Sequence, residues 1–497
     1  MGQYLSPGVY VEEVPPLARP IAGVGTSTPG FIGVIQKNTI KLLSPPPSKE
    51  TTSPRWVEYN LPSVENEPRR ISSWSEYVKY FGGFIGGSTV PNAIKVVKEP
   101  EGTSLTTYVT GVTDANLTVM ASWASNSKNN TGIAESNGNF KILIDNGTED
   151  VIVTTTLSGK NYNVDDGQRY LAHAVYGFFN NGGSSCYVSR IASEDKLQDA
   201  LNKFAAIDEI TMVAAPGFST IAAYTKLINH CELLKDRVAI LDSVAEVPDL
   251  SKLQKVLAPP ETVGAPPETV GRPQDTTYAA FYFPWLQVFD PGQSLIDAAP
   301  DAKPNPAGPG YLYVPPSGHI AGVYARNDNT RGVFKAPANE ALMGVTGLKY
   351  TLSKADQDGL NGVGVNLIRP LVGAFRVWGA RTVGGDANGE YRYISTRRYF
   401  NYLRESIDQG TQFVVFEPNS PALWERIKRS VGGFLLNEWR AGALFGTTPD
   451  KAFFVKCDAD TNPPDVREAG QVVTEIGVAI VKPAEFVIFR IQQTTGN

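Results

Sequence analysis

The chain has 497 residues, of which 42% are hydrophobic and 19% are charged, and this composition is typical of a soluble globular protein. A formal net charge of -5 and a pI of about 5.5 argue against nucleic-acid binding as the main function. At about 100 to 200 residues per domain, the length predicts roughly two to four domains.

Cysteine usage and the first residues indicate folding in a reducing cytoplasm. Cys186, Cys231 and Cys457 lie far apart in the sequence and cannot form a disulfide framework. The N-terminus lacks the basic and apolar run of a cleaved signal peptide, and no run of about 18 apolar residues is present to span a bilayer. We therefore expect no stable membrane insertion.

Two strand-like segments stand near the two ends of the chain. They are SPGVYVEEV at 6–14 and AEFVIFRIQ at 484–492, and the second is apolar on both faces except at Arg490. Two-sided apolar character is typical of an internal strand. Because a bare strand leaves its backbone N–H and C=O groups unpaired, both segments require a partner sheet.

The amino-acid composition of the chain changes after a predicted buried strand at Gly30–Ile35. Residues 37–167 are rich in Ser, Thr, Asn and Gly and contain alternating segments such as LTVMASW and DVIVTTTL, which predict a β-rich outer insertion. DNG at 145–147 is a hairpin signal, and WSEYVKYFGGF at 74–84 predicts one short helix ended by glycine.

From Gln168 onward, strands and helices alternate, which predicts an α/β middle domain at 168–345 with a parallel or mixed sheet. A tandem repeat, APPETVG at 258–264 and 265–271, is typical of an extended surface loop. The expected helices are RYLAHAVYGFF, LQDALNKF and TIAAYTKLINHCELLKD, and the expected strands are CYVSRI, EITMVAAPG, RVAILDS and TYAAFYFPWLQVF.

The last part, 346–497, contains one strongly amphipathic helix over Ser420–Arg440, with Ser420 as N-cap and Pro421 at the first position. Strands KAFFVKCD, GQVVTEIGVAIVKP and AEFVIFRIQ follow it. Together with residues 1–36, these patterns predict an α+β or α/β multidomain protein with mixed-sheet cores and helices on the faces. The apolar face of the helix comprises Leu423, Trp424, Ile427, Val431, Phe434, Leu435 and Trp439.

Residues suited to catalysis lack the motifs that would make them a site. Asp242 follows an apolar strand like a metal-binding aspartate, but no G-x-x-x-x-G-K-[ST] loop is present, so a turn residue is the favoured interpretation. Ser317, His319 and Asp328 lack a G-x-S-x-G elbow, and a helix start explains them equally well. We expect no catalytic residue, no cofactor and no metal.

The metal-ligating residue types also lack a binding pattern. His173, His230 and His319 form no close pair. Asp458, Asp460 and Asn462 have the spacing that opens a calcium loop, yet Pro463 and Ala469 stand where glycine and a bidentate glutamate are needed. A polar loop is the better interpretation.

Long blocks in order along the chain resemble the contractile tail sheath protein family of phages and related injection systems. The resemblance covers the first 35 residues and most of the chain from Tyr278 onward, whereas 37–166 matches no family pattern, as expected of a variable outer domain. The blocks are YLSPGVYVEEV, TSTPGFIGV, YAAFYFPWLQVFDP, VPPSGHIAGVYARNDNTRGVFKAPANEAL, RPLVGAFRVWGARTV, FEPNSPALWERIKRSVGGFLLNEWRAGALFGTTPDKAFFVKCD and TNPPDVREAGQVVTEIGVAIVKPAEFVIFRI.

The resemblance implies a subunit that forms a helical cylinder around an inner tube and contracts to drive the tube through a target envelope. Its partners would be copies of itself, the inner tube protein, and baseplate and terminator proteins, with no direct contact to nucleic acid. It would assemble in the bacterial cytoplasm and become part of a virion tail or a contractile injection particle.

In that family the terminal strands are donated to a sheet of neighbouring subunits. By position, the donated strands here would be Gly8–Val14 and Ala484–Gln492, and the receiving sheet would lie in the last third of the chain. The linkers PPLARPIAGVG and VKP would let subunits re-pack while the strands stay joined. The strand residues carried over are Val9, Tyr10, Val11 and Val14, and Phe486, Val487, Ile488, Phe489 and Ile491.

The polar face of the Ser420–Arg440 helix is the candidate for the surface that faces the inner tube, through Arg426, Lys428 and Arg429. A solvated helix face is the alternative. For the whole protein, two alternatives also remain: another phage-type shell or baseplate component with swapped strands, and a cytosolic α/β enzyme that uses the Asp242 region.

Overall fold

The computed structural model describes residues 20–35, 62–82, 84, 169–258, 269–291, 293 and 304–488. For residues 166–168 and the remaining strands between 39 and 158, it describes the backbone alone. The chain divides into two compact units. The sheet unit comprises Gly25–Asn401 and Glu485–Asn497, and the helical unit comprises Met1–Val24 and Tyr402–Ala484.

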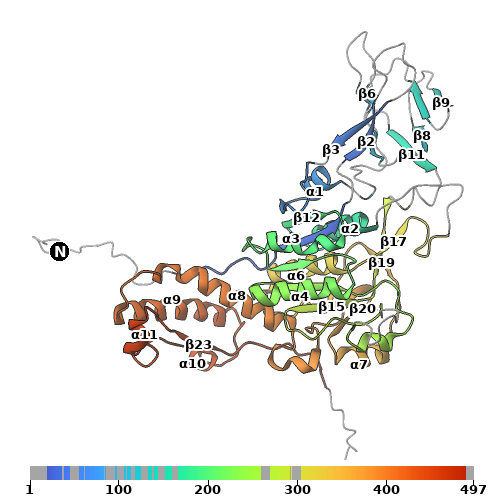
Figure 1. Ribbon diagram of the computed structural model, residues 1–497. Coiled ribbons are helices and arrows are strands. Elements are labelled where there is room, and N and C mark those ends of the chain that lie inside the picture. The colour runs from blue at the N-terminus through green and yellow to red at the C-terminus, as the bar shows by residue number, and fades with distance from the viewer. Residues whose placement is uncertain are drawn as a thin grey trace, which may run out of the picture. The chain divides into compact units, whose positions relative to one another are not determined.

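A mixed sheet forms the framework of the sheet unit (Figure 1). In spatial order its strands are β18 (Glu340–Ala341), β21 (Ala374–Val377), β20 (Val365–Leu371), β15 (Ala279–Phe283), β14 (Val238–Asp242), β13 (Met212–Ala214), β1 (Pro29–Val34), β12 (Cys186–Ile191) and β4 (Arg69–Ile71). Neighbours from β20 to β12 are parallel, whereas β4, β21 and β18 pair antiparallel. Parallel strands covered on both faces are apolar on both faces, and every side chain of β15 is accordingly buried.

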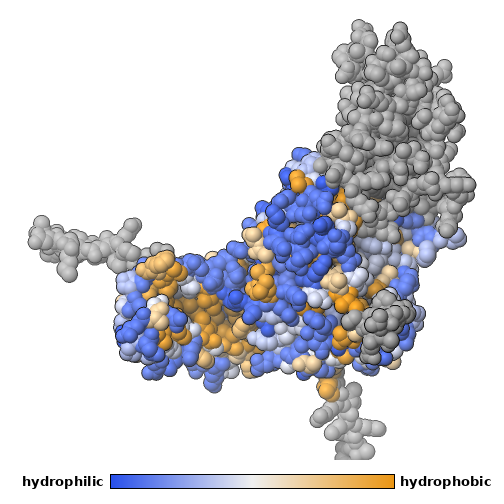
Figure 2. Space-filling model, viewed as in Figure 1, coloured by the Kyte–Doolittle hydropathy of each residue, from blue (hydrophilic) through white to orange (hydrophobic). Residues whose placement is uncertain are grey.

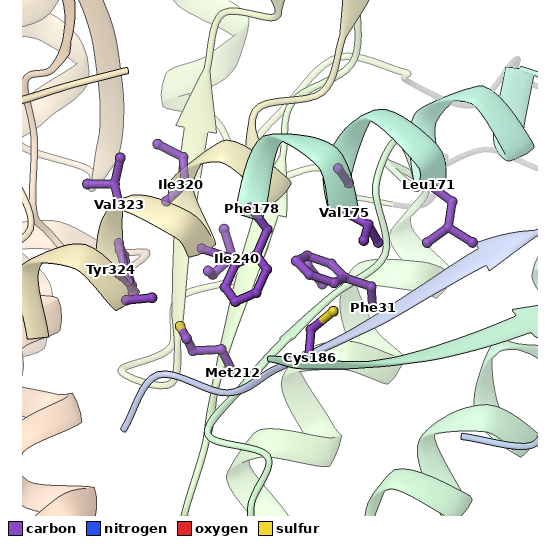
Figure 3. Packing of buried hydrophobic residues seen from close by; sticks show 14 of the residues in the cluster. Phe31, Leu171, Val175, Phe178, Cys186, Met212, Ile240, Ile320, Val323 and Tyr324 are labelled. Carbon is purple, nitrogen blue, oxygen red and sulfur yellow. The ribbon is translucent and has the colours of Figure 1, made fainter. Parts of the chain in front are cut away.

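Helices cover both faces of this sheet, which confirms the mixed α/β architecture. One face carries α1 (Trp74–Phe81), α2 (Asp166–Asn180) and α6 (Ser317–Arg331), and the other carries α3 (Leu197–Phe204), α4 (Ile221–Leu234) and α7 (Lys354–Asn361). Successive residues of a strand point to opposite faces, so Phe31 and Ile32 of β1 belong to different clusters. Figure 3 shows Phe31 beside Val175 and Phe178 of α2, and the Phe31 and Phe178 ring centroids are 5.7 Å apart.

Helices α2 and α6 approach each other closely at two glycines of α6. A Cβ added at Gly318 would lie 2.2 Å from the Cα atom of Ala174, and one added at Gly322 would lie 2.5 Å from the carbonyl oxygen of Phe178. These neighbours are backbone atoms, which cannot move aside without displacing a helix. The close packing of α2 on α6 therefore requires glycine at both positions.

Two predictions for the sheet unit are wrong. The segment TYAAFYFPWLQVF is two strands, because Pro284 has no N–H to continue the ladder after β15. Asp242 is the buried last residue of β14 and does not lie in a turn. The second strand, β16 (Leu286–Phe289), joins a separate sheet with β17 (Tyr311–Val314) and β19 (Val345–Leu348).

The predicted insertion contains several small antiparallel sheets. They are β2 (Thr39–Ser44), β3 (Arg55–Asn60) and β7 (Val109–Val112); β5 (Val96–Val97) and β6 (Thr106–Thr107); β8 (Thr118–Ala124) and β11 (Ile152–Ser158); and β9 (Gly132–Ser136) and β10 (Asn139–Leu143). The DNG turn lies outside the described residues, but β10 and β11 pair with β9 and β8, so they do not form the predicted hairpin. Within the same segment, β4 is an edge strand of the large sheet, and α1 packs on one face of that sheet.

The helical unit contains the second half of α8 (Ile394–Thr411) and the helices α9 (Pro421–Arg440), α10 (Pro449–Ala452) and α11 (Pro464–Glu468), with strands β22 (Phe453–Lys456) and β23 (Glu475–Val478). The predicted helix is confirmed as α9. Ser420 is its N-cap residue, although the Ser420 hydroxyl makes no capping hydrogen bond. The predicted apolar residues of α9 are buried except Trp439, which is half-buried.

No sequence pattern predicted α8, and its burial explains why. Many of its buried residues are polar, so the helix has no continuous apolar stripe. They are Ser395, Thr396, Arg397, Arg398, Asn401 and Ser406. Strands on both sides of residue 345 share the large sheet, and the predicted division into four domains stays a prediction.

We expect Gly318→Ala to lower the free energy of unfolding by about 1 to 3 kcal/mol, because the added methyl group meets the α2 backbone. Gly433→Ala in α9 is the matched control, since nothing lies within 4 Å of its added Cβ. The control should be stabilised by about 0.5 to 1 kcal/mol through helix propensity. Thermal unfolding of the two variants tests this, and equal stability would contradict the close helix contact.

Candidate assembly surfaces

The C-terminal segment exposes consecutive apolar side chains at the end of the described chain. Phe486, Val487 and Ile488 are 70%, 69% and 78% exposed, and none of them lies in a strand. The other predicted residues of this strand, Phe489 and Ile491, lie outside the described residues. A contiguous apolar surface of this kind is typical of an interaction site.

Glu485, directly before these residues, is bound by three side chains of the sheet unit. Its carboxylate accepts hydrogen bonds from Nε and Nη2 of Arg381 at 2.9 and 2.8 Å, from Nδ2 of Asn361 at 2.8 Å and from the hydroxyl of Tyr393 at 2.8 Å. Burial acts to raise the pKa of Glu485, but these donors outweigh burial and the pKa is lowered. The exposed segment therefore begins at a firmly held carboxylate.

At the other end of the chain, the residues that precede β1 pack on the second half of α8. The Val24 N–H donates to Oγ of Ser406 at 3.1 Å, and Ile21, which is 8% exposed, contacts the position of Gly410. The predicted linker PPLARPIAGVG is thus attached to its own chain from Ile21 onward. The strand residues before it, Val9, Tyr10, Val11 and Val14, lie outside the described residues.

The helical unit contains a two-stranded antiparallel sheet in the last third of the chain, in which Phe453 of β22 lies opposite Val478 of β23. Within the described residues, no third strand pairs with it. The Ala479 N–H donates to the carbonyl of Ala452 at 2.8 Å. The antiparallel ladder alternates, so the backbone groups of Val478 and Ile476 point away from β22. One edge of this sheet is therefore open to another strand.

Apolar side chains around this sheet are exposed as well. Phe454 of β22 is 57% exposed, and its ring covers Gly477 on the opposite strand. Phe445 and Val473 are 73% and 38% exposed. Figure 2 shows hydrophobic residues gathered on a face of the helical unit over α8 and α9. The sequence identifies these residues only as apolar. Alternation along a strand does not distinguish a side chain that faces the core from one that is exposed for contact with a partner.

The connection between α8 and α9 carries a further exposed aromatic residue. Phe416 is fully exposed and has a φ of 65°, a backbone conformation that bulky residues rarely adopt. Its neighbour Val415 is 58% exposed. The run FVVF at 413–416 was the available sequence signal for this feature.

The three residues predicted to face a tube have different surroundings on α9. Arg426 Nη1 lies 3.3 Å from the carboxylate of Glu417, and Lys428 Nζ lies 2.5 Å from that of Glu425. Arg429 is exposed, and the described residues place no acidic side chain in an ion pair with it. Part of the predicted basic surface is thus balanced by acidic groups of the same chain.

Two glycines follow Arg429 in the middle of α9. No atom lies within 4 Å of a Cβ added at Gly432 or at Gly433. Glycine inside a helix costs about 1 kcal/mol relative to alanine. No contact within the described residues requires glycine at either position. The two glycines leave a flat, open surface on α9 beside Arg429.

Asp242 serves the architecture of the sheet unit. Its carboxylate accepts hydrogen bonds from the Ser317 N–H and hydroxyl, both at 2.7 Å, and from the Gly217 N–H at 3.3 Å. Burial raises the pKa of Asp242 to about 7, although these donors act to lower it. The interaction joins the end of β14 to the start of α6.

The remaining candidates for chemistry also have structural partners. Asp328 accepts from Arg398 at 2.9 Å while Ser317 binds Asp242, so neither is engaged with His319. Burial lowers the pKa of His319 to about 3, which keeps its imidazole neutral. No cluster of His, Cys, Asp or Glu that could hold a metal is found among the described residues.

The loop that resembled the opening of a calcium site is stabilised by its own hydrogen bonds. Asp458 Oδ1 accepts from the N–H groups of Asp460 and Thr461 at 3.0 and 3.2 Å. The buried Asn462 side chain exchanges hydrogen bonds with the backbone of Val473. These contacts support the interpretation as a polar loop.

Two family models match the chain. Residues 386–494 match the phage tail sheath C-terminal domain, and residues 269–383 match the phage tail sheath protein central domain. The solved PVC sheath complex of an extracellular contractile injection system, in the contracted state, has the same fold. It aligns over 99% of both chains with a TM-score of 0.62 and 24% identity.

Two curated relatives are similar over part of the chain. The tail sheath protein of Vibrio phage KVP40 is 29% identical over 181 residues, and that of Burkholderia phage BcepMu is 29% identical over 189 residues. Each alignment covers 36% of this chain, but only 26% and 38% of the respective relatives. Within the described residues, no helix is both long and apolar enough to cross a bilayer.

Thermal stability should fall as the pH rises from about 5 to about 7.5, in part because of Asp242. Its folded-state pKa of about 7 lies above an unfolded value of about 3.9, so the folded chain favours the neutral carboxyl. The stabilisation is complete below the unfolded pKa and is lost as the pH rises through the folded pKa. Asp242→Asn should flatten this decline in melting temperature, whereas Glu468→Gln at an exposed site should not. If the melting temperature of Asp242→Asn falls with rising pH as steeply as that of the unmodified chain, Asp242 does not cause the decline.

Proposed function

The chain belongs to the contractile tail sheath protein family, and from this premise we propose that it is the structural subunit of a contractile sheath. Subunits polymerise into a helical cylinder around an inner tube, and contraction drives the tube through a target envelope. The observation that carries the proposal is the exposed apolar segment Phe486–Ile488 in a chain that also has an open sheet edge at β23.

Strand exchange joins the subunits in this proposal. The C-terminal strand Ala484–Gln492 and the N-terminal strand Gly8–Val14 of neighbouring subunits extend the β22–β23 sheet. The outward backbone groups of Ile476 and Val478 would pair with one donated strand, and exposed Phe445 and Phe454 are apolar residues available to contact it. The donated side chains would then be buried, which accounts for their apolar character.

The free energies of strand exchange favour many weak contacts between subunits over one strong contact. A donated strand adds about 6 to 8 backbone hydrogen bonds at about 0.5 to 1.5 kcal/mol each, and buries about three to five apolar side chains at about 1.5 to 3 kcal/mol each. Association and ordering cost about 4 to 15 kcal/mol, so one strand binds modestly. Two donated strands per subunit act multivalently, and head-to-tail contacts with a rise generate a helix.

Contraction in this scheme requires no nucleotide. The extended cylinder is a kinetically trapped lattice, and larger contacts between subunits in the contracted lattice provide the free energy. The further partners are the inner tube protein and the baseplate and terminator proteins. Assembly takes place in the bacterial cytoplasm, without direct contact to nucleic acid.

The tube contact is assigned to α9. Arg429 is exposed, and Gly432 and Gly433 leave room for close approach of a partner backbone. Arg426 and Lys428 can exchange their acidic partners Glu417 and Glu425 for acidic groups on the tube, because exposed ion pairs contribute little. This side of the helix therefore suits an acidic partner surface.

Removing Met1–Val14, or ending the chain after Glu485, should leave a folded protein that does not polymerise. The reason is that each deletion removes a strand that pairs only with another subunit. Negative-stain electron microscopy over a range of concentrations should show striated cylinders for the full chain and discrete particles for both truncations. Circular dichroism checks folding. A truncated chain that unfolds would show that the strand pairs within its own chain, and cylinders from a truncated chain would exclude its donation.

Reversing the charges of Arg426, Lys428 and Arg429 to glutamate should weaken co-assembly with the tube protein, most strongly at low salt, because salt screens exposed charges. Pelleting of sheath with tube at several salt concentrations measures the effect. The matched control reverses Lys252, Lys255 and Arg331, which are exposed on the sheet unit. If both triple variants co-assemble like the unmodified chain, α9 does not face the tube.

A further inference from the structure

Arg381, which binds Glu485, is held in place by contacts that do not involve Glu485. The side chain of Arg381 is only 4% exposed, and its Nη1 also binds Asp386 at 3.0 Å and the carbonyl oxygen of Asn361 at 3.1 Å. Arg381 therefore keeps its orientation through contacts that do not involve Glu485. Its remaining nitrogens form a two-pronged contact with the Glu485 carboxylate, the strongest geometry for such a pair.

The chain around Glu485 is otherwise weakly held. The Glu485 side chain is 19% exposed, whereas Lys482, Ala484 and Phe486 are exposed residues. The preceding backbone anchor is the Val481 N–H, which donates to the carbonyl of Ala443 at 3.2 Å. The predicted linker VKP thus begins at one anchor, Val481, and the second anchor, Glu485, follows it closely. The linker therefore adds no free length to the residues after Glu485.

We propose that Glu485 is a positioning residue that fixes the base of the C-terminal arm, defined as Phe486–Asn497, on the sheet unit. The exchanged strand then starts at the residue directly after the anchor, so a neighbour must present its sheet edge next to Arg381 and Tyr393. The inference rests on the proposed strand exchange and adds to it the point at which the arm is attached.

Attachment at Glu485 sets the length of the tether between subunits. If Glu485 were released, the preceding anchor would be Val481, and the four added residues would lengthen the tether by up to about 14 Å. The effective concentration of a tethered strand falls as the tether exceeds the distance it must span. A held carboxylate therefore strengthens exchange without adding any contact between subunits.

The first test measures release of the arm in the unassembled full chain, by chymotrypsin cleavage after Phe486. A protease must extend several residues on either side of the cleaved bond, so it acts only when Glu485 is released. Asn361→Ala combined with Tyr393→Phe removes two hydrogen bonds to Glu485 and leaves the cleaved sequence unaltered. Cleavage should accelerate about tenfold in this double variant and more in Glu485→Ala.

Two controls separate positioning from general stability. Glu468→Ala removes an exposed carboxylate of the helical unit and should leave the cleavage rate unchanged. The rate for Glu485→Ala is divided by the rate on a free peptide of the same sequence, which corrects for protease preference. Melting temperatures of all variants are measured in parallel. Cleavage rates equal to the control in both the double variant and Glu485→Ala would overturn the proposal.

The second test separates this inference from the proposed function. The protein concentration at which cylinders appear should rise about two- to fivefold in the double variant, because a longer tether lowers the effective concentration. If the full chain forms cylinders, the chain ending after Glu485 does not, and the double variant assembles like the full chain, then strand exchange holds and positioning by Glu485 fails. If the chain ending after Glu485 forms cylinders, the proposed strand exchange on which this inference rests fails.

Discussion

The central place of β1 in the parallel ladder is the constraint on which the rest of the structure depends. β1 pairs with β12 on one side and β13 on the other, so both of its faces must enter a core. A Cβ on Gly33 would lie 2.7 Å from that of Leu171, which shows how tightly α2 is packed on the strand. The N-terminal segment leaves the middle of the sheet, and its residues Ile21 and Val24 pack on the second half of α8 before the chain continues towards its N-terminus.

The C-terminal end reaches the same unit by a different route. The chain passes through the helical unit and returns to the sheet unit at Glu485, where Arg381 binds it. The C-terminal strand of the proposed exchange is therefore rooted in the sheet unit, while Ile21, Val24 and the open β22–β23 sheet belong to the helical unit. A lattice built this way can carry load from sheet unit to neighbouring helical unit through covalent chain and backbone hydrogen bonds. The buried ionisable groups serve this framework, as Asp242 does by joining β14 to α6.

Periodicity identified most of the framework, and its failures have physical causes. The helices α2, α3, α4 and α9 and the strands β1, β12, β13, β14 and β15 were predictable because apolar side chains recur at the spacing of each structure. The strands β4, β18, β20 and β21 of the same sheet were not predicted. α8 was missed because its buried face is largely polar. The break between β15 and β16 at Pro284 was missed because apolar side chains continue through the segment. The backbone hydrogen bonds of the ladder cannot continue through a proline. At the candidate surfaces, the sequence indicated the apolar segment at 486–488, but it did not indicate that Phe416, Phe445 and Phe454 are exposed.

The sequence by itself determined the class of fold, the apolar terminal segments and the family resemblance, because these reside in local residue patterns. Only the tertiary structure decided which apolar residues are left exposed, which edge of β23 is open and where the C-terminal segment is held. Glu485 illustrates the reason. As one carboxylate in the sequence it resembles any solvated residue, and its binding to Arg381, Asn361 and Tyr393 exists only because folding brings distant segments together.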